Sequence, residues 1–311
     1  MSWLVGKALE AASSLSSGFV PQLLTFPSTQ VLTTALIAEG GYSYVYSARE
    51  VSSQGKVYAV KKVIAQDAET RAVAEMEMEV LQLVSGRADF VGCYGTLRRA
   101  GAGGATEYWM LLEYCGSGSL IDVVYRKDGE GRYERGPPLS QERVLELFET
   151  LAQAVAFLHS LAPPVAHRDL KMENVLLADD GRLVLCDLGS ATRRTLPATR
   201  SRAEAAEEEE RIAKYSTQMY RAPEMVDLHA GHAVDEKADV WALGCMLYTM
   251  CFGAHPFAAE STLQILNVAY TVPSGSPYSE SVHDLIRAML SMPPTARPSA
   301  YAAHAHTHIL T

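Results

Sequence analysis

The hydrophobic pattern of this 311-residue chain changes character near residue 112, and this change constrains the fold more than any other feature. Before it, β-branched and aromatic residues gather in short runs that are typical of strands in an antiparallel sheet. The runs are 31–37, 44–48, 57–63 and 109–112. One helix is expected among them, over residues 68–84, because apolar residues recur there at helical spacing.

After residue 117, helical spacing predominates. Ser140 is expected to cap a long helix whose apolar stripe begins at Val144. The fold class is therefore predicted to be α+β, with an antiparallel sheet lobe that carries one helix, followed by a mainly helical lobe. A ligand held between two such lobes suits this order of elements.

Composition narrows the class of protein. The hydrophobic content of 48% is enough for a sizeable core. A formal net charge of -9 argues against nucleic acid as a partner, because such binding needs dense Lys/Arg patches. The five cysteines are scattered without metal-ligand spacing, so we expect reduced thiols, no disulfide and a cytoplasmic location.

Residues 1–30 are read as an N-terminal extension. Residues 11–38 carry no charge, but Pro21, Pro27 and repeated Ser and Thr make them too polar for a transmembrane helix. Residues 2–19 could form an amphipathic helix that lies on a membrane surface. We favour the alternative, a frayed or docked extension.

One short segment carries the chemistry, and it reads His-Arg-Asp-Leu-Lys-Met-Glu-Asn from residue 167 to residue 174. Asp169 can accept the proton of a substrate hydroxyl, and Lys171 can neutralise a phosphoryl group in transfer. Asn174 can bind Mg²⁺ through its amide oxygen. A charged turn between a helix and a strand is the alternative reading of these eight residues alone.

Other residues supply the partners that phosphoryl transfer from ATP requires. Asp187 follows an apolar run and precedes Leu188 and Gly189, so its carboxylate could hold Mg²⁺ against the ATP phosphates. Lys61 ends a predicted strand and Glu77 lies on the following helix, so the two could form the ion pair that positions the α and β phosphates.

A glycine turn precedes Lys61 over residues 38–45. Small residues let backbone amides approach phosphates, and Val45 would cover the adenine. Compared with the usual G-x-G-x-x-G-x-V pattern, Ala38 and Ser43 replace the outer two glycines and only Gly40 remains.

From residue 31 to residue 310, these motifs and their order resemble the eukaryotic protein kinases, together with Ala222-Pro223-Glu224, the run 239–244 and Arg297. The resemblance implies a bilobal kinase fold with an N-lobe at 31–112, a hinge at 113–116 and a C-lobe at 117–310. It also implies a buried ion pair between Glu224 and Arg297, and an Asp239 that braces the catalytic loop.

The resemblance implies which residues contact ATP, with the adenine bonded to the backbone of the hinge. They are Ile37, Ala38, Glu39, Gly40, Gly41, Tyr42, Ser43, Val45, Ala59, Lys61, Leu112, Glu113, Cys115 and Leu176. Cys186 is expected to line the same pocket. Lys171 and Thr217 together resemble serine/threonine kinases, so serine and threonine hydroxyls of proteins are the expected targets.

Three stretches, 38–43, 185–191 and 217–228, are similar to the Numb-associated kinases, which include the adaptor-associated and cyclin-G-associated kinases. Residues 201–215 are rich in Ala and Glu, with Glu207 and Arg211, and Glu210 and Lys214, at i, i+4 spacing, so they predict a helix on which Glu207–Glu210 is a solvated face. The resemblance adds that Numb-associated kinases carry an extra helix here, packed beside the substrate groove. It also implies clathrin-adaptor subunits as targets, at endocytic or Golgi membranes. Leu188 departs from the phenylalanine that is usual in these kinases.

Two other functions compete with an active protein kinase. The first is a pseudokinase scaffold with little turnover, suggested by Leu188 and the altered glycine turn but opposed by the intact Lys61, Glu77 and Asp169. The second is a small-molecule kinase of similar fold, which would not need Thr217 or the segment 222–224 to build a peptide groove.

Overall fold

The computed structural model describes residues 20–41, 43–51, 55–257 and 261–310. Tyr42 and residues 2–19 lie outside the described residues, so the ATP contact of Tyr42 and the membrane contact of residues 2–19 stay predictions. The chain divides into two compact units. The first runs to Leu120 and includes Glu173–Gly189, and the second contains Ile121–Met172 and the residues from Ser190 onward.

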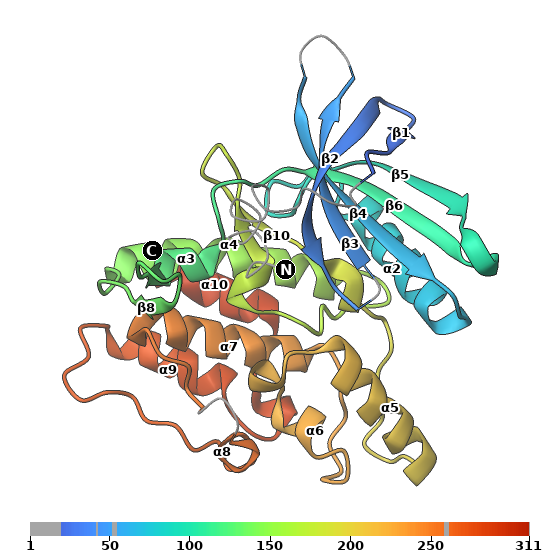
Figure 1. The fold of residues 1–311 in the computed structure, drawn as a ribbon. Coiled ribbons are helices and arrows are strands. Elements are labelled where there is room, and N and C mark those ends of the chain that lie inside the picture. The colour runs from blue at the N-terminus through green and yellow to red at the C-terminus, as the bar shows by residue number, and fades with distance from the viewer. Residues whose placement is uncertain (1–19, 42, 52–54, 258–260, 311) are drawn as a thin grey trace. The chain divides into compact units, whose positions relative to one another are not determined.

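The first unit is built on a six-stranded sheet with strand order β1-β2-β3-β4-β6-β5, in which every neighbouring pair is antiparallel (Figure 1). The four predicted strands are confirmed, while β1 and β5 were not predicted. The strands are β1 (Leu23–Thr25), β2 (Gln30–Glu39), β3 (Ser43–Glu50), β4 (Val57–Ala65), β5 (Cys93–Ala100) and β6 (Thr106–Glu113).

Side chains alternate between the two faces of the sheet along β4 and β6, so that one face carries apolar core residues and the other carries Lys61. Val60 pairs with Leu111, and both belong to the buried cluster on one face of the sheet. The next residue, Lys61, pairs with Met110 and points to the opposite face. The helix α2 (Ala68–Leu83) contacts β4 and β6. It begins at Asp67, whose carboxylate accepts the Thr70 N–H at 2.7 Å.

A second, two-stranded sheet belongs to the same unit. It consists of β9 (Val175–Leu177) and β10 (Leu183–Leu185). The backbone of Leu185 bonds to both Asp89 and Val91, which ties this hairpin to the first unit. Residues 173–189 therefore cluster with the sheet, although sequence patterning assigned everything after residue 117 to the helical part.

The second unit is mainly helical, as predicted. Its helices are α3 (Leu120–Val124, which begins at the boundary), α4 (Gln141–Ser160), α5 (Arg202–Tyr215), α6 (Pro223–Val226), α7 (Lys237–Phe252), α8 (Thr262–Leu266), α9 (Glu280–Met289) and α10 (Ala300–Leu310). A small hairpin joins β7 (Tyr125–Lys127) to β8 (Tyr133–Arg135). Ser140 caps α4 as expected, because its hydroxyl accepts the Arg143 N–H.

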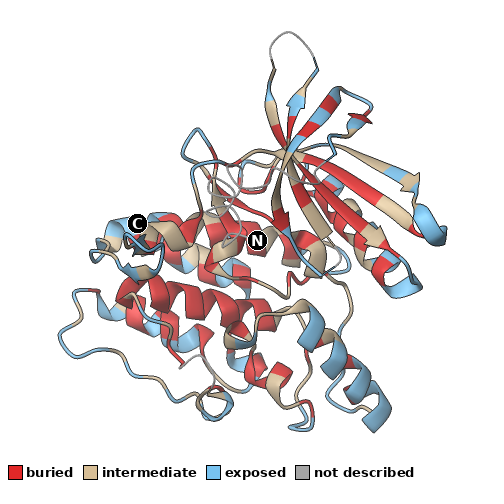
Figure 2. Ribbon diagram, in the orientation of Figure 1, coloured by how far each residue is buried: buried red, intermediate tan, exposed pale blue. Residues whose placement is uncertain are grey.

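Helix α7 forms the centre of the second unit. Every residue of it after Lys237 is buried, and Figure 2 shows this helix almost entirely in the buried colour. It contacts both α4 and α9. A helix that is apolar on all sides is a core helix. Within the described parts of the chain, no helix combines the length and the apolar character that crossing a bilayer requires.

Candidate functional site

A mostly apolar pocket lies in the first unit, beside the strands on which the sequence predicted the ATP contacts. Its lining is Ile37, Ala38, Val45, Ala59, Lys61, Glu77, Leu81, Val91, Leu112, Glu113, Tyr114, Cys115, Leu176, Cys186 and Asp187. Nine of the residues expected to contact ATP are in this set. Glu39, Gly40, Gly41 and Ser43, which belong to the glycine turn, are not.

Three lining residues were missed by sequence reasoning. Leu81 lies four residues after Glu77 on α2, so helical spacing could have indicated it. Tyr114 lies between two hinge residues that were predicted. Val91 carries no motif, and it reaches the pocket because its N–H bonds to the carbonyl of Leu185.

The predicted ion pair between Lys61 and Glu77 is present and buried. Lys61 Nζ lies 2.5 Å from Glu77 Oε1 and 2.8 Å from Asp187 Oδ1. Burial alone would lower the pKa of Lys61, but the carboxylates of Asp187 and Glu77 outweigh it and raise that pKa. Burial raises the pKa of Glu77, against the opposing effect of Lys61. The lysine is therefore held in its charged form.

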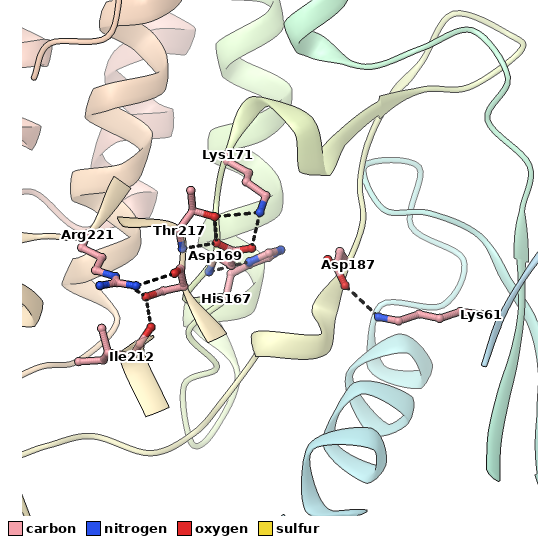
Figure 3. Close-up of polar contacts among 9 residues, drawn as sticks. Lys61, His167, Asp169, Lys171, Asp187, Ile212, Thr217 and Arg221 are labelled. Carbon is pink, nitrogen blue, oxygen red and sulfur yellow. Dashed lines mark hydrogen bonds and ion pairs between the residues drawn. The ribbon is translucent and has the colours of Figure 1, made fainter. Parts of the chain in front are cut away.

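Asp187 has a backbone conformation that is rare for a residue with a side chain, with a φ of 57°. Such strain is retained mainly where function requires it. Gly189 permits the close packing beside it, since a Cβ there would lie 3.2 Å from Lys61 Nζ and 3.3 Å from Glu77 Oε2. Figure 3 shows Asp187 directed toward Lys61.

Asn174, the other predicted metal ligand, is buried beside β10, where its carbonyl accepts the N–H of Cys186 at 2.9 Å. An amide oxygen and a carboxylate are the donors that Mg²⁺ prefers. The chemistry of Asn174 and Asp187 therefore fits this ion.

In the second unit, Asp169 is the centre of a hydrogen-bond network, drawn in Figure 3. Its Oδ1 accepts the Thr217 N–H at 2.8 Å and the Thr217 hydroxyl at 2.7 Å. Its Oδ2 accepts from Lys171 Nζ at 2.8 Å, and Lys171 also donates to Thr217 Oγ1 at 2.8 Å. The three residues that sequence reasoning singled out here are thus joined directly.

Asp239 on α7 holds the loop that carries Asp169. Its carboxylate accepts the N–H groups of His167 at 2.7 Å and Arg168 at 2.9 Å, as well as His159 Nε2 at 2.9 Å. Burial alone would raise the pKa of Asp239, but these hydrogen bonds and the nearby histidines keep it below its ordinary value. Arg168 is held with a φ of 67°, so the loop is strained as well as anchored.

The buried pair that the resemblance implied, Glu224 with Arg297, is also present. The guanidinium contacts the two carboxylate oxygens at 2.6 and 2.7 Å, and both side chains have 0% exposure. This bidentate geometry is the strongest form of such a pair.

Helix α5 confirms the helix expected within 201–215, and Ser201 with Glu204 forms a capping box at its start. The expectation of a solvated face over Glu207–Glu210 is wrong for Glu208. That residue is 6% exposed and pairs with Arg194, which also pairs with Glu207. The i, i+4 reading missed Arg194, since it lies outside the helix.

All five cysteines are free thiols, as predicted. Cys115 and Cys186 both line the pocket. Burial raises the pKa of both thiols, that of Cys115 to about 12, and the nearby Glu113 adds to the shift at Cys115. Both therefore stay protonated at neutral pH, in agreement with a packing role.

Acid should weaken the second unit through His255. Burial lowers the pKa of His255 to about 4. The unfolded chain then binds more protons, so stability is full above about pH 6.5 and falls as the pH drops toward 4, by at most about 3 kcal/mol. Urea unfolding at pH 7 and pH 4.5 should show a smaller pH dependence for His255→Gln than for the wild type. The same change at the exposed His306 is the control, and equal pH dependence in all three proteins would contradict the prediction.

Comparison with known proteins extends over nearly the whole chain. A family model described as the protein kinase domain matches residues 32–309. A probable serine/threonine-protein kinase of Dictyostelium discoideum is 38% identical over 288 residues, which cover 92% of this chain and 35% of that protein. A protein kinase domain-containing protein of Schizosaccharomyces pombe is 36% identical over 298 residues, covering 94% of this chain and 45% of that protein. The chain thus spans less than half the length of these relatives.

Proposed function

The chain belongs to the protein kinase family, and from this premise we propose that it transfers the γ-phosphoryl group of ATP to serine and threonine hydroxyls of proteins. The observation that carries the proposal is the network in which Asp169, Lys171 and Thr217 bond to one another. A carboxylate held this way can orient an incoming hydroxyl and accept its proton. The buried ion pair of Lys61 with Glu77 supports the same activity.

Each residue then has one task. ATP binds in the pocket of the first unit, with its adenine at the backbone of Glu113 and Cys115 and its phosphates near Lys61. Asn174 and Asp187 would hold Mg²⁺, which supplies positive charge to the phosphates when bound. Asp169 takes the proton of the substrate hydroxyl, and Lys171 stabilises the charge of the phosphoryl group in transfer. The proposed kinase domain is residues 31–310, and the extension before it, residues 1–30, contributes strand β1 to the sheet.

A transfer assay tests this function. Purified protein is incubated with Mg²⁺, labelled ATP and a generic protein substrate, and the label is then assigned by phosphoamino-acid analysis. We expect phosphoserine and phosphothreonine, at a rate about 10²- to 10⁴-fold above that of Asp169→Asn. A wild-type rate equal to that of Asp169→Asn would leave a pseudokinase scaffold in its place, and phosphotyrosine alone would overturn the choice of hydroxyl.

We also propose a narrower identity, a Numb-associated kinase that acts on clathrin-adaptor or other trafficking proteins in the cytoplasm, with residues 2–19 in contact with endocytic or Golgi membranes. The three stretches 38–43, 185–191 and 217–228 and the presence of α5 support this proposal. It rests on family analogy. The phosphoproteome should lose phosphate at adaptor subunits within minutes of acute inhibition, and unchanged adaptor subunits would remove the trafficking role.

A further inference from the structure

Ser216 and Arg221 lie on either side of Thr217 in the sequence. Neither has a role in the mechanism proposed above. Thr217 follows Ser216 directly, and Arg221 lies just before the segment 222–224. Arg221 donates from Nε to Ser216 Oγ at 2.9 Å and from NH2 to the Ser216 carbonyl at 2.9 Å. Figure 3 shows this guanidinium pointing toward the backbone beside Thr217.

Ser216 is fixed from its other side by helix α5. Its N–H and its hydroxyl both donate to the carbonyl of Ile212, at 3.1 and 2.6 Å. Ile212 is itself buried, at 6% exposure. The backbone of Ser216 therefore sits between the last turn of α5 and a charged donor, and the peptide group that leads to Thr217 has little freedom.

The position of that peptide group decides where Asp169 points. The N–H and the hydroxyl of Thr217 both donate to the same oxygen, Asp169 Oδ1. A shift of Thr217 would release both bonds to Oδ1, whereas the bond from Lys171 to Oδ2 does not depend on Thr217. Misplacement of a reacting group by about 1 Å can lower a rate about 10²-fold.

Charge adds a second link. The guanidinium of Arg221 interacts with the carboxylate of Asp169, and this interaction partly opposes the lowering of the Arg221 pKa by burial. The charged or titratable groups that the second unit brings to Asp169 include Lys171, Arg221 and His167. Arg221 influences Asp169 through its charge, while its hydrogen bonds go to Ser216.

We propose that Arg221 is a positioning residue for phosphoryl transfer, which acts through Ser216 to hold Thr217 against Asp169 and so couples α5 to the catalytic carboxylate. This inference rests on the proposed kinase activity. It predicts an effect on the use of the protein substrate and none on the binding of ATP. Arg221 and Ser216 belong to the second unit, whereas the residues that line the pocket all belong to the first.

The test compares Arg221→Met, Arg221→Lys and Ser216→Ala, with Arg202→Met as the matched control on the exposed start of α5. We expect Arg221→Met to lower kcat/KM for the protein substrate about 10- to 100-fold while KM for ATP is unchanged. Arg221→Lys should recover part of the lost rate, because lysine keeps one charged donor for the Ser216 carbonyl, and Ser216→Ala should also slow the reaction.

Hydrogen exchange of the Thr217 amide gives a readout that does not depend on turnover. Exchange should be faster in Arg221→Met and Ser216→Ala than in the wild type, and unchanged in Arg202→Met. Wild-type rates and wild-type Thr217 protection in Arg221→Met would overturn the proposal. Should that variant fail to fold, Ser216→Ala decides the question, since wild-type rates and wild-type Thr217 protection in Ser216→Ala would equally overturn the proposal. An inactive wild type would instead contradict the kinase activity, and the exchange data would still test the positioning.

Discussion

Replacing Lys61 by methionine should lower kcat/KM for phosphoryl transfer by about 10²- to 10³-fold, which is the usual cost of losing one charged donor to a developing anion. Methionine nearly keeps the length and the apolar stem of lysine, so the sheet around β4 stays packed. The charge that faces Asp187 is lost, and Glu77 loses its partner in a site where both it and Lys61 are almost fully buried. Steady-state kinetics with ATP as the varied substrate measure this effect.

The neighbouring residue provides the matched control. Lys62 lies on the opposite face of β4, pairs with Glu107 at 2.7 Å, and stacks on the ring of Trp109. Lys62→Met should change kcat/KM less than about threefold, because this face contributes nothing to the pocket. Similar losses in Lys61→Met and Lys62→Met would show that the sheet was damaged and that Lys61 has no special role.

Replacing Arg297 by methionine should cost about 3 to 5 kcal/mol of unfolding free energy, because it leaves the carboxylate of Glu224 buried without its partner. The guanidinium also donates to the carbonyls of Ser291 and Lys237, at 3.0 Å each, and it lies 5.0 Å from the ring centroid of Trp241. Three segments of the second unit therefore lose a common partner. Urea unfolding followed by tryptophan fluorescence measures the change.

An exposed pair tests whether burial is the cause. Arg143 contacts Glu146 at 2.7 Å on the surface of α4, and both side chains are largely accessible to water. Arg143→Met should cost less than about 1 kcal/mol. The double variant Glu224→Gln with Arg297→Met should be more stable than Arg297→Met alone, since it removes the isolated buried charge. A double variant no more stable than Arg297→Met would argue that packing dominates.

Sequence patterning was most accurate where a single chemical requirement fixes a residue. The ion pair of Lys61 with Glu77 follows from a strand that carries a lysine and a following helix that presents Glu77 on its apolar face. The structure contains the pair, with Lys61 in the middle of β4 and not at its predicted end. The cap at Ser140 is equally local, because the hydroxyl has to satisfy an N–H three residues on. The cap depends on residues that are neighbours in the sequence, and the ion pair depends on the need of a buried lysine for a carboxylate partner.

Features that depend on distant partners were not predictable. Strand β5 contains Gly95 and two adjacent arginines, so its propensity is weak, and its pairing with β6 makes it a strand. Glu208 looked solvated because its partner Arg194 lies before the helix. Val91 reaches the pocket only through the β10 hairpin. In each case tertiary contacts outweigh the local pattern.

The protonated state of Cys115 has a consequence for the design of covalent inhibitors. A thiol in a nucleotide pocket invites acrylamides and other electrophiles that react with thiolates. Because burial raises its pKa to about 12, the Cys115 side chain is almost entirely protonated at pH 7. Reagents whose rate depends on the thiolate will therefore be slow here, and selectivity would have to come from tight reversible binding that holds the electrophile beside the sulfur.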